Sequence, residues 1–185
     1  MFICWLFLAK IMILEPRMRK NEIFQEDIIL NSYCPMTKKL ESMYGYSHLS
    51  RPMFHKIMSL GNPEGKTVLD IGCGSNGHVT RSFEPWLSRS LTILGARVIG
   101  LDIGYLGNEI FENYKVDLTK LDCLSFIKDN SVDLAVADSF FNAPCFSDGK
   151  ITGKQVYDSL LPQLERVVKP DGYFVYDDSF DVFEL

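Results

Sequence analysis

Residues 68–77 read VLDIGCGSNG, and this stretch decides the fold that we predict for the chain. A short apolar run that ends at glycine is typical of a buried strand that leads into a turn. Gly72, Gly74 and Gly77 form the pattern GxGxxG, in which glycines let the main chain turn tightly and approach a ligand closely. The stretch therefore predicts a strand followed by a ligand-binding loop, and the pattern alone leaves the ligand open.

From Lys66 onward, apolar runs of strand length alternate with stretches of helical length. The predicted strands are KTVLDIG (66–72), ARVIGLDIG (96–104), YKVDLT (114–119), SVDLAVADSFF (131–141) and GYFVYDDSF (172–180), and the predicted helices span 78–95 and 155–170. Residues 170–172 are expected to form the turn into the last strand. Strands nearly continuous in Val, Ile, Leu and Ala, separated by helices, indicate a parallel sheet covered on both faces. We therefore predict an α/β fold with a doubly wound, Rossmann-like, mostly parallel sheet.

The 185-residue chain divides into three predicted parts. Residues 1–20 form an apolar leader that the domain could do without, residues 21–65 a helical preamble or lid, and residues 66–185 the ligand-binding domain. The apolar run of residues 1–14 is shorter than the roughly 20 residues of a membrane-spanning helix. We rank a dispensable leader with Met18 as the working start first, a helix that covers the domain second, and membrane contact by residues 1–14 last.

The composition bounds the partners and the compartment. The net charge of -5 leaves no excess of Lys and Arg to neutralise phosphates, so nucleic acid is not an expected partner. The 5 cysteines are scattered, odd in number and never spaced as a zinc site. This pattern favours free thiols in a reducing compartment, and we expect a cytoplasmic protein.

Acidic residues stand at the ends of the predicted strands, the edge where α/β sheets bind ligands. A carboxylate at Asp70, about 6 Å from a pyrophosphate, would cost on the order of 3 kcal/mol. Asp70 therefore opposes a nicotinamide dinucleotide, the oxidoreductase alternative, and favours a ligand with positive charge. Asp102 can accept hydrogen bonds from both hydroxyls of a ribose, and Asp117 can meet an exocyclic amine of adenine. These strand ends suit an adenosine joined to a cationic tail, with Ile103 and Leu118 packing on the adenine.

The ordered motifs of the chain resemble those of class I S-adenosylmethionine-dependent methyltransferases. The resemblance rests on VLDIGCGSNG (68–77), VIGLDIG (98–104), VDLTKLDCLSFIKDNSVDLAVA (116–137) and LLPQLERVVKPDGYFVYDD (160–178). It covers about residues 66–178 and is most similar to the broad family, type 11-like, whose members read VLDIGCGxG at the first strand. It implies S-adenosyl-L-methionine as the cofactor and methyl transfer to an acceptor, which we expect to be a small molecule.

The resemblance also implies roles for individual residues. The cofactor-binding set is Asp70, Gly72, Cys73, Gly74, Asp102, Ile103, Asp117, Leu118 and Asp138. The first four would cradle the methionine part, and Asp138 would lie near its ammonium and the transferred methyl group. Asp102 would bind the ribose and Ile103 would line the adenine, whose edge Asp117 and the Leu118 backbone would read. We interpret the thiol within the loop as a small filler rather than a nucleophile, because no residue near it in the sequence favours a thiolate.

Candidate acceptor contacts lie in two segments. Tyr44 and His48 precede the first strand, in a region that members of the family use to cover the substrate. They could line the acceptor or supply a base, although a helix that packs on the sheet is the favoured interpretation. Ser139 and Phe140 lie in ADSFFNAP, which is similar to the D-P-P-Y signature of enzymes that methylate amino groups on bases but lacks both prolines. They are weaker candidates for acceptor contacts, and the catalytic base is left unassigned.

Two further features keep alternatives open. Asp138, Asp177 and Asp178 stand at two strand ends, where carboxylates could bind a divalent cation. Capping or solvated aspartates are the favoured interpretation, and no metal is expected. The chain ends at Leu185, soon after the fifth predicted strand, whereas the family continues through a sixth strand and an antiparallel seventh. This end favours a fragment or a shortened enzyme, and it keeps open a non-catalytic module that binds the cofactor or a partner.

Overall fold

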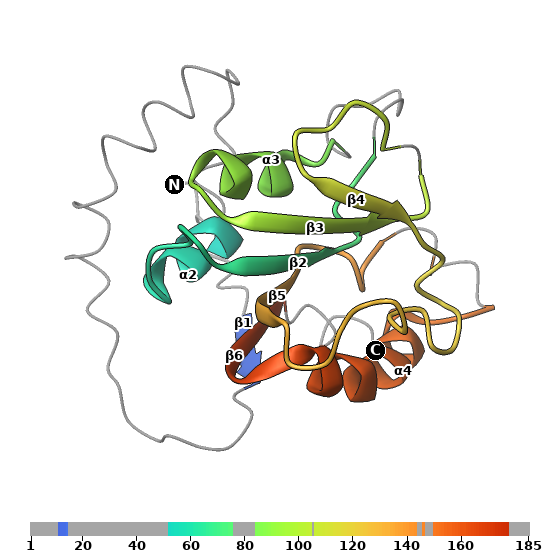
Figure 1. The fold of residues 1–185 in the computed structure, drawn as a ribbon. Coiled ribbons are helices and arrows are strands. Elements are labelled where there is room, and N and C mark those ends of the chain that lie inside the picture. Colours follow the sequence, from blue (N-terminus) through green and yellow to red (C-terminus); the bar gives the residue numbers. More distant parts are fainter. Residues whose placement is uncertain are drawn as a thin grey trace, which may run out of the picture.

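The computed structural model describes residues 11–14, 52–75, 84–104, 106–143, 146 and 150–177. In chain order the elements are β1 (Ile11–Leu14), α2 (Pro52–Ser59), β2 (Thr67–Ile71), α3 (Trp86–Ile93), β3 (Arg97–Asp102), β4 (Glu112–Lys115), β5 (Val132–Ala137), α4 (Gly153–Val167) and β6 (Val168–Asp177). The strands form one sheet with helices beside it (Figure 1). The predicted α/β alternation is confirmed.

The sheet has the strand order β1-β6-β5-β2-β3-β4. Strands β2 to β6 all run parallel to one another, and β1 pairs antiparallel with β6. The chain moves from β2 outward to β3 and β4, and then returns to the other side of β2 with β5 and β6. Such a reversal is the switch point at which doubly wound sheets bind ligands, outside the carboxyl ends of the strands. The predicted doubly wound sheet is confirmed, and its switch point lies at β2, between β3 and β5.

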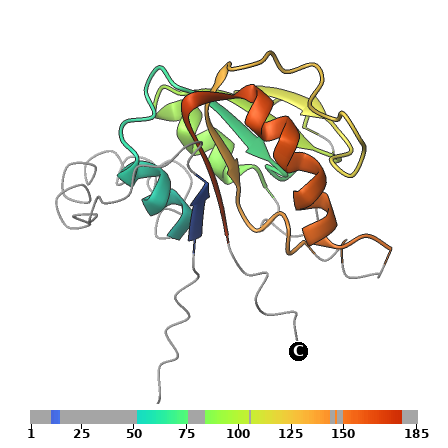
Figure 2. The ribbon, with the colours of Figure 1, turned by 90° about the horizontal axis from the view of Figure 1, so that it is seen from below.

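Two hydrophobic clusters cover the two faces of the sheet. Alternate residues of a strand point to opposite faces, so Val68 packs with α2 and α3 on one face. Leu69 and Ile71 pack with α4 on the other. Figure 2 shows α4 and α2 on different sides of the strands. Helices therefore cover both faces, as the apolar strands required.

Local sequence signals set the ends of α3 and α4. Gly95 follows α3 at a φ of 89° and donates its N–H to the Thr92 carbonyl at 3.0 Å, as glycines after helices do. At the start of α4, the Thr152 hydroxyl accepts the Gln155 N–H at 3.2 Å, and the Gln155 side chain accepts the Thr152 N–H at 2.8 Å. A Cβ on Gly153 would lie 1.8 Å from the Phe141 carbonyl oxygen, so α4 begins in direct contact with the segment after β5.

Two strand boundaries differ from the prediction. β4 ends at Lys115, so Asp117 follows the strand instead of lying within it. β6 runs through residues 170–172, which were predicted to form a turn. The register between β5 and β6 shifts between Val132 and Leu134, so β6 bulges where its proline cannot donate to the ladder. Proline and glycine are common in both bulges and turns. The turn predicted at residues 170–172 is therefore wrong, and these residues belong to the irregular part of β6.

The N-terminal leader contributes a strand to the sheet. In β1, Ile13 lies opposite Val175 of β6. The rest of residues 1–20 lies outside the described residues, so the dispensability of the leader stays a prediction. Of the predicted preamble, the structure describes α2, whose first residue is Pro52, a position that suits the fixed φ of proline. No helix in the described part of the chain is long and apolar enough to cross a membrane.

Candidate functional site

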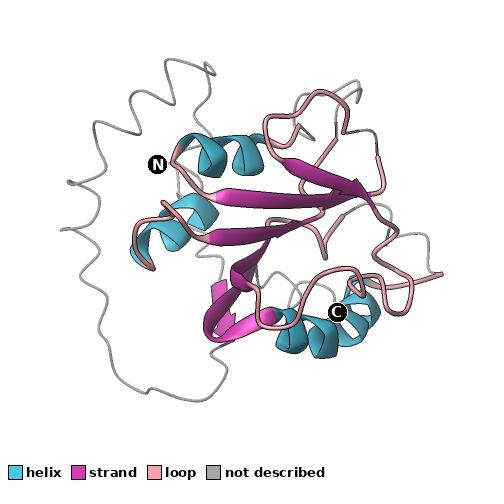
Figure 3. Cartoon of the chain, viewed as in Figure 1, coloured by secondary structure: helices cyan, strands magenta, loops and turns pink. Residues whose placement is uncertain are grey.

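The carboxyl ends of β2, β3 and β5 lie at one edge of the sheet (Figure 3). Directly after β2, Gly72 and Gly74 have φ values of 66° and 91°, a region that is open to glycine and strained for other residues. A Cβ on Gly72 would lie 2.1 Å from the Phe140 ring, which follows β5. The glycine loop therefore turns tightly, as predicted, and has no room for a side chain at its first glycine.

Asp102 ties the glycine loop to the end of β3. Its Oδ2 accepts the Gly74 N–H at 3.1 Å, and its Oδ1 accepts the Gly104 N–H at 2.7 Å. Each carboxylate oxygen can accept a second hydrogen bond. Asp102 therefore fixes two loops and keeps acceptor capacity for two hydroxyl groups, an arrangement that suits a ribose.

Asp70 is buried in this edge, with 1% of its surface exposed. The Ser88 hydroxyl, from α3, donates to its Oδ2 at 2.6 Å. Burial raises the pKa of Asp70 to about 7; the Ser88 hydrogen bonds oppose this increase, and the charges of Asp138 and Asp102 add to it. Two carboxylates thus oppose the ionisation of a third, a charge pattern that attracts a cationic group and repels a pyrophosphate.

Two residues of α3 that the sequence analysis did not single out shape the site. The first is Ser88. The second is Arg89, which donates to both carboxylate oxygens of Glu109 at 2.8 Å and to Glu84 at 3.0 Å. The hydrogen bonds of Glu109 raise the pKa of Arg89 further above its usual value, and the Glu109 side chain is only 3% exposed. This pair holds the loop after β3 against α3. Periodicity could not reveal either contact, because the partners come from separate elements.

The residues predicted on the adenine side are placed differently from one another. Ile103 is 64% exposed, so its side chain is available to a flat ring. Asp117 accepts both the N–H and the hydroxyl of Thr119, at 3.1 and 2.6 Å, and these bonds lower its pKa. Leu118 is buried in the cluster beneath α4, so its side chain is not placed to pack on adenine. Asp117 thus uses part of its hydrogen-bond acceptor capacity within its own turn. Leu118 can contribute only backbone groups to an adenine site.

Cys73 lies inside the glycine loop. It is buried, and its N–H donates to the Leu101 carbonyl at 3.0 Å. Burial, followed by the charges of Asp70 and Asp102, raises the pKa of its thiol far above the usual value. A thiol held in its neutral form is a poor nucleophile. This environment fits the interpretation of Cys73 as a filler of the loop.

The segment after β5 reaches across to the glycine loop. Ser139 has a φ of 59°, which is uncommon outside glycine, and its hydroxyl lies 3.3 Å from Oδ1 of Asp138. The ring of Phe140 packs edge-on against those of Phe141 and Phe146, with centroids 5.1 and 5.5 Å away. The turn at Ser139 thereby places Phe140 over the glycine loop, next to the position predicted for the transferred group.

Several predicted residues lie outside the described residues. Tyr44, His48 and Asp178 belong to this group, and for Asp177 the structure describes the backbone. In the ranges that the structure describes, no three His, Cys, Asp or Glu side chains are grouped so as to hold a metal ion. The acceptor roles of Tyr44 and His48 and the metal alternative therefore stay predictions.

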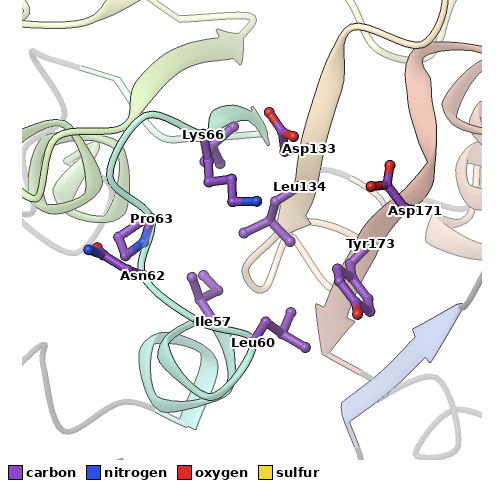
Figure 4. Close-up of a pocket in the computed structure, with 11 residues that line it drawn as sticks. Ile57, Leu60, Asn62, Pro63, Lys66, Asp133, Leu134, Asp171 and Tyr173 are labelled. Atoms are coloured by element: carbon purple, nitrogen blue, oxygen red, sulfur yellow. The ribbon is translucent and has the colours of Figure 1, made fainter. Parts of the chain in front are cut away.

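A hollow of about 70 Å³ lies at the opposite edge of the sheet, near the amino ends of β2 and β5 (Figure 4). Lys66, Asp171 and Tyr173 are among its lining residues. Asp133 also lines the hollow, and its carboxylate accepts hydrogen bonds from the Lys169 ammonium at 2.7 Å and from the Thr67 N–H at 2.8 Å. This hollow is separated from the glycine loop by the length of β2, and the sequence analysis did not predict it.

The chain is similar to known methyltransferases, although no family model matches it. The fatty-acid O-methyltransferase of Mycolicibacterium smegmatis is 25% identical over 180 residues, which are 91% of this chain and 59% of that protein. The phthiotriol/phenolphthiotriol dimycocerosates methyltransferase 1 of Mycobacterium ulcerans is 25% identical over 132 residues, 68% of this chain and 42% of that protein. The crystal structure of a SAM-dependent methyltransferase from Aquifex aeolicus superposes only loosely, with a TM-score of 0.44 and 23% identity over 75% of this chain and 70% of that chain. The chain thus spans about half the length of the curated relatives it matches.

Proposed function

We propose that this chain, a relative of methyltransferases, binds S-adenosylmethionine at the carboxyl edge of its sheet and transfers the methyl group to a small-molecule acceptor. The two curated relatives support methyl transfer as the reaction class. Because the chain spans 59% of the M. smegmatis relative, the activity of that whole protein is carried over here as a proposal.

The observation that carries this proposal is the bond between the glycine loop and Asp102. The Gly74 N–H on Oδ2 of Asp102 joins a loop that admits close approach to a carboxylate with remaining acceptor capacity. This junction lies beside the switch point of the sheet. It suits an adenosine whose ribose faces Asp102 and whose tail runs along the loop.

The surrounding residues would each hold one part of the cofactor. Asp102 would accept the ribose hydroxyls, and the exposed Ile103 side chain would pack on the adenine. Asp117 and the Leu118 backbone would read the adenine edge. The tail, which carries an ammonium group, would lie between Asp70 and Asp138, whose charge already raises the pKa of Asp70. A dinucleotide has no positive group in that position, so the same charges disfavour it.

When bound, the cofactor supplies a methyl group on a sulfonium, an electrophile that is already activated. The residues of the chain then hold donor and acceptor in line, and such positioning can supply roughly 7–11 kcal/mol of a barrier. A base is needed only for an acceptor that must lose a proton. We assign no base among the described residues.

The aromatic segment after β5 supports an acceptor with an apolar part. Phe140 and Phe146 are both partly buried, and they contact each other edge-on beside the glycine loop. Aromatic rings provide a large apolar surface for such a group. Since the M. smegmatis relative is named a fatty-acid O-methyltransferase, a fatty acid is the first acceptor to test.

The test is transfer of label from S-adenosyl-[methyl-³H]methionine to a panel of long-chain fatty acids, hydroxylated lipids and small phenols. We expect labelled ester or ether with at least one acceptor, and loss of the label transfer in Asp102→Ala. Binding of S-adenosylhomocysteine without transfer to any acceptor would favour the non-catalytic module. Failure to bind it at all would contradict the proposed function.

A further inference from the structure

The contact between Ser88 and Asp70 joins α3 to the end of β2. Ser88 is the third residue of α3, and its side chain and that of Asp70 are both buried, with 0% and 1% of their surface exposed. The Ser88 hydroxyl donates to Oδ2 of Asp70 at 2.6 Å, and its backbone N–H also favours the ionised carboxylate. The first turn of a helix stabilises an anion in this position. α3 thus presents two donors to a carboxylate that is otherwise removed from water.

The groups that face Asp70 come from four elements. Asp102 at the end of β3 and Asp138 after β5 both disfavour its ionised form. Cys73, from the glycine loop, is a neutral thiol whose own ionisation Asp70 opposes. On α3, Ser88 donates a hydrogen bond to Asp70. The neighbouring Arg89 forms ion pairs with Glu109 and Glu84. Among these described groups, those that act on Asp70 are hydrogen-bond donors and negative charges, so a cationic group of a ligand would stabilise its ionised form.

We propose that Ser88 is a positioning residue of the cofactor site, which orients the Asp70 carboxylate toward the ammonium group of the bound ligand, so that binding releases whatever proton Asp70 carries in the empty site. This inference rests on the proposed function, because the ammonium belongs to the amino acid tail of the cofactor. The balance is simple. A carboxylic acid and an ammonium ligand become a carboxylate and ammonium pair, and the proton goes to solvent.

Because binding and ionisation of Asp70 are linked, the affinity for the ligand should depend on pH. With the pKa of Asp70 at about 7, the empty site is half protonated near neutral pH. Below that pH, a ligand that needs the carboxylate loses affinity by about tenfold per pH unit. Above it, the affinity is constant. A ligand that lacks the ammonium group has no such dependence.

The experiment is isothermal titration calorimetry of the full chain between pH 5.5 and 8.5, in buffers of different ionisation enthalpy. The two ligands are S-adenosylhomocysteine, which carries the ammonium group, and 5′-methylthioadenosine, which keeps the nucleoside and lacks the amino acid. We expect S-adenosylhomocysteine to release about half a proton at pH 7, and methylthioadenosine to release none. The difference between the two ligands cancels any group whose titration responds to the nucleoside that they share.

Two serines of α3 provide matched variants. Ser88→Ala removes the hydroxyl that stabilises the ionised form, so the midpoint of the affinity curve should move upward by about one pH unit. S-adenosylhomocysteine should then bind about fivefold more weakly at pH 7 and almost equally at pH 8.5. Ser90→Ala removes an equally buried hydroxyl, which donates to the Trp86 carbonyl at 2.8 Å and not to Asp70. Its midpoint should stay that of the wild type.

The outcomes separate this inference from the proposed function. S-adenosylhomocysteine that binds with no more proton release than methylthioadenosine overturns the inference alone. A Ser88→Ala curve with the wild-type midpoint, lower at every pH, shows a purely structural role and also overturns it. No binding of either ligand at any pH contradicts the proposed function as well. If Ser88→Ala does not fold, the comparison of the two ligands on the wild-type chain still decides.

Discussion

The two edges of the sheet shift the pKa of an aspartate in opposite directions. At the amino edge, burial alone would raise the pKa of Asp133, but hydrogen bonds from Lys169 and the Thr67 N–H, with the nearby lysine charges, lower it. At the carboxyl edge, burial and two carboxylate neighbours raise the pKa of Asp70 to about 7 against the hydrogen bonds of Ser88. Both aspartates lie on adjacent strands of one sheet, β2 and β5.

The two edges differ in how the charge of their aspartate is compensated. The carboxylate of Asp133 is balanced by a cation of the chain itself, so nothing further is needed there. At the carboxyl edge, the charges of Asp138 and Asp102 instead both raise the pKa of Asp70. Groups with strongly perturbed pKa values gather at functional sites because function requires charges that the fold alone would not favour. The raised pKa of Asp70 therefore favours a ligand site at the carboxyl edge without reference to any family resemblance.

Substitutions at two glycines, one at each edge of the sheet, compare the backbone of the two edges. They are expected to give the largest change in the free energy of unfolding. Gly72 and Gly65 have φ values of 66° and 72°, but a Cβ on Gly72 meets the Phe140 ring while a Cβ on Gly65 meets nothing within 4 Å. We expect Gly72→Ala to lower the free energy of unfolding by about 3 kcal/mol, from strain and overlap together. Gly65→Ala should cost about 1 kcal/mol, from strain alone. Urea unfolding measures both, and equal costs would show that Phe140 does not constrain the loop.

Asp102→Ala tests the ligand side of the comparison. The variant loses both ribose hydrogen bonds and releases the Gly74 and Gly104 amides, so S-adenosylhomocysteine should bind about fifty-fold more weakly. Asp171→Ala is the matched control, because Asp171 is an exposed carboxylate at the amino edge. Its affinity should be that of the wild type. Equal weakening by both variants, measured by calorimetry, would mean that the pocket has been misplaced.

Asp70→Asn tests the electrostatic cost of the carboxyl edge in the ligand-free chain. A carboxyl whose pKa is raised by folding contributes stability at low pH, and this contribution is lost as the pH rises through about 7. The wild type should therefore lose about 2 kcal/mol relative to Asp70→Asn between pH 5.5 and 8.5. Urea unfolding at several pH values gives this difference. Parallel stability curves for the two proteins would contradict the raised pKa.

Asp133→Asn should show the opposite dependence and the smallest effect. Because folding lowers the pKa of Asp133, its contribution is present above the unfolded value of 3.8 and is lost as the pH falls through the lower folded value. Loss of the charge-assisted bond to the partly exposed Lys169 should cost about 1 kcal/mol at pH 7. The difference should close in acid, while the affinity for S-adenosylhomocysteine stays unchanged. A gap that widens in acid would contradict this account of the amino edge.

The elements that sequence patterns predicted well are those whose signal is local. β2, β3 and β5 are continuous apolar runs with clear ends, and Gly95 marks the end of α3 in the conformation that glycine alone adopts easily. The positions of Asp70 and Asp102 at one edge followed from the parallel sheet. Both carboxylates lie where the strand pattern placed them.

The features that the sequence did not reveal depend on contacts between distant residues. Ser88 is an ordinary serine of an amphipathic helix until α3 packs on β2 and brings its hydroxyl to Asp70. Leu118 resembles a surface residue after a strand, yet the turns before β5 fold it into the core beneath α4. The bulge in β6 carries the residues of a turn because both structures need a break in the ladder. In each case tertiary packing selects one of several local structures or environments that the local sequence allows equally.

The most direct test of the central claim is the thermal and urea stability of the full chain with S-adenosylhomocysteine and, separately, with NAD. A ligand that binds the folded state stabilises it by about 2.7 kcal/mol at one hundred times its dissociation constant. We predict stabilisation of this kind by S-adenosylhomocysteine, its loss in Asp102→Ala, and no effect of NAD at the same concentration. Stabilisation by NAD and none by S-adenosylhomocysteine would contradict the assignment of the carboxyl edge to a cationic adenosine ligand.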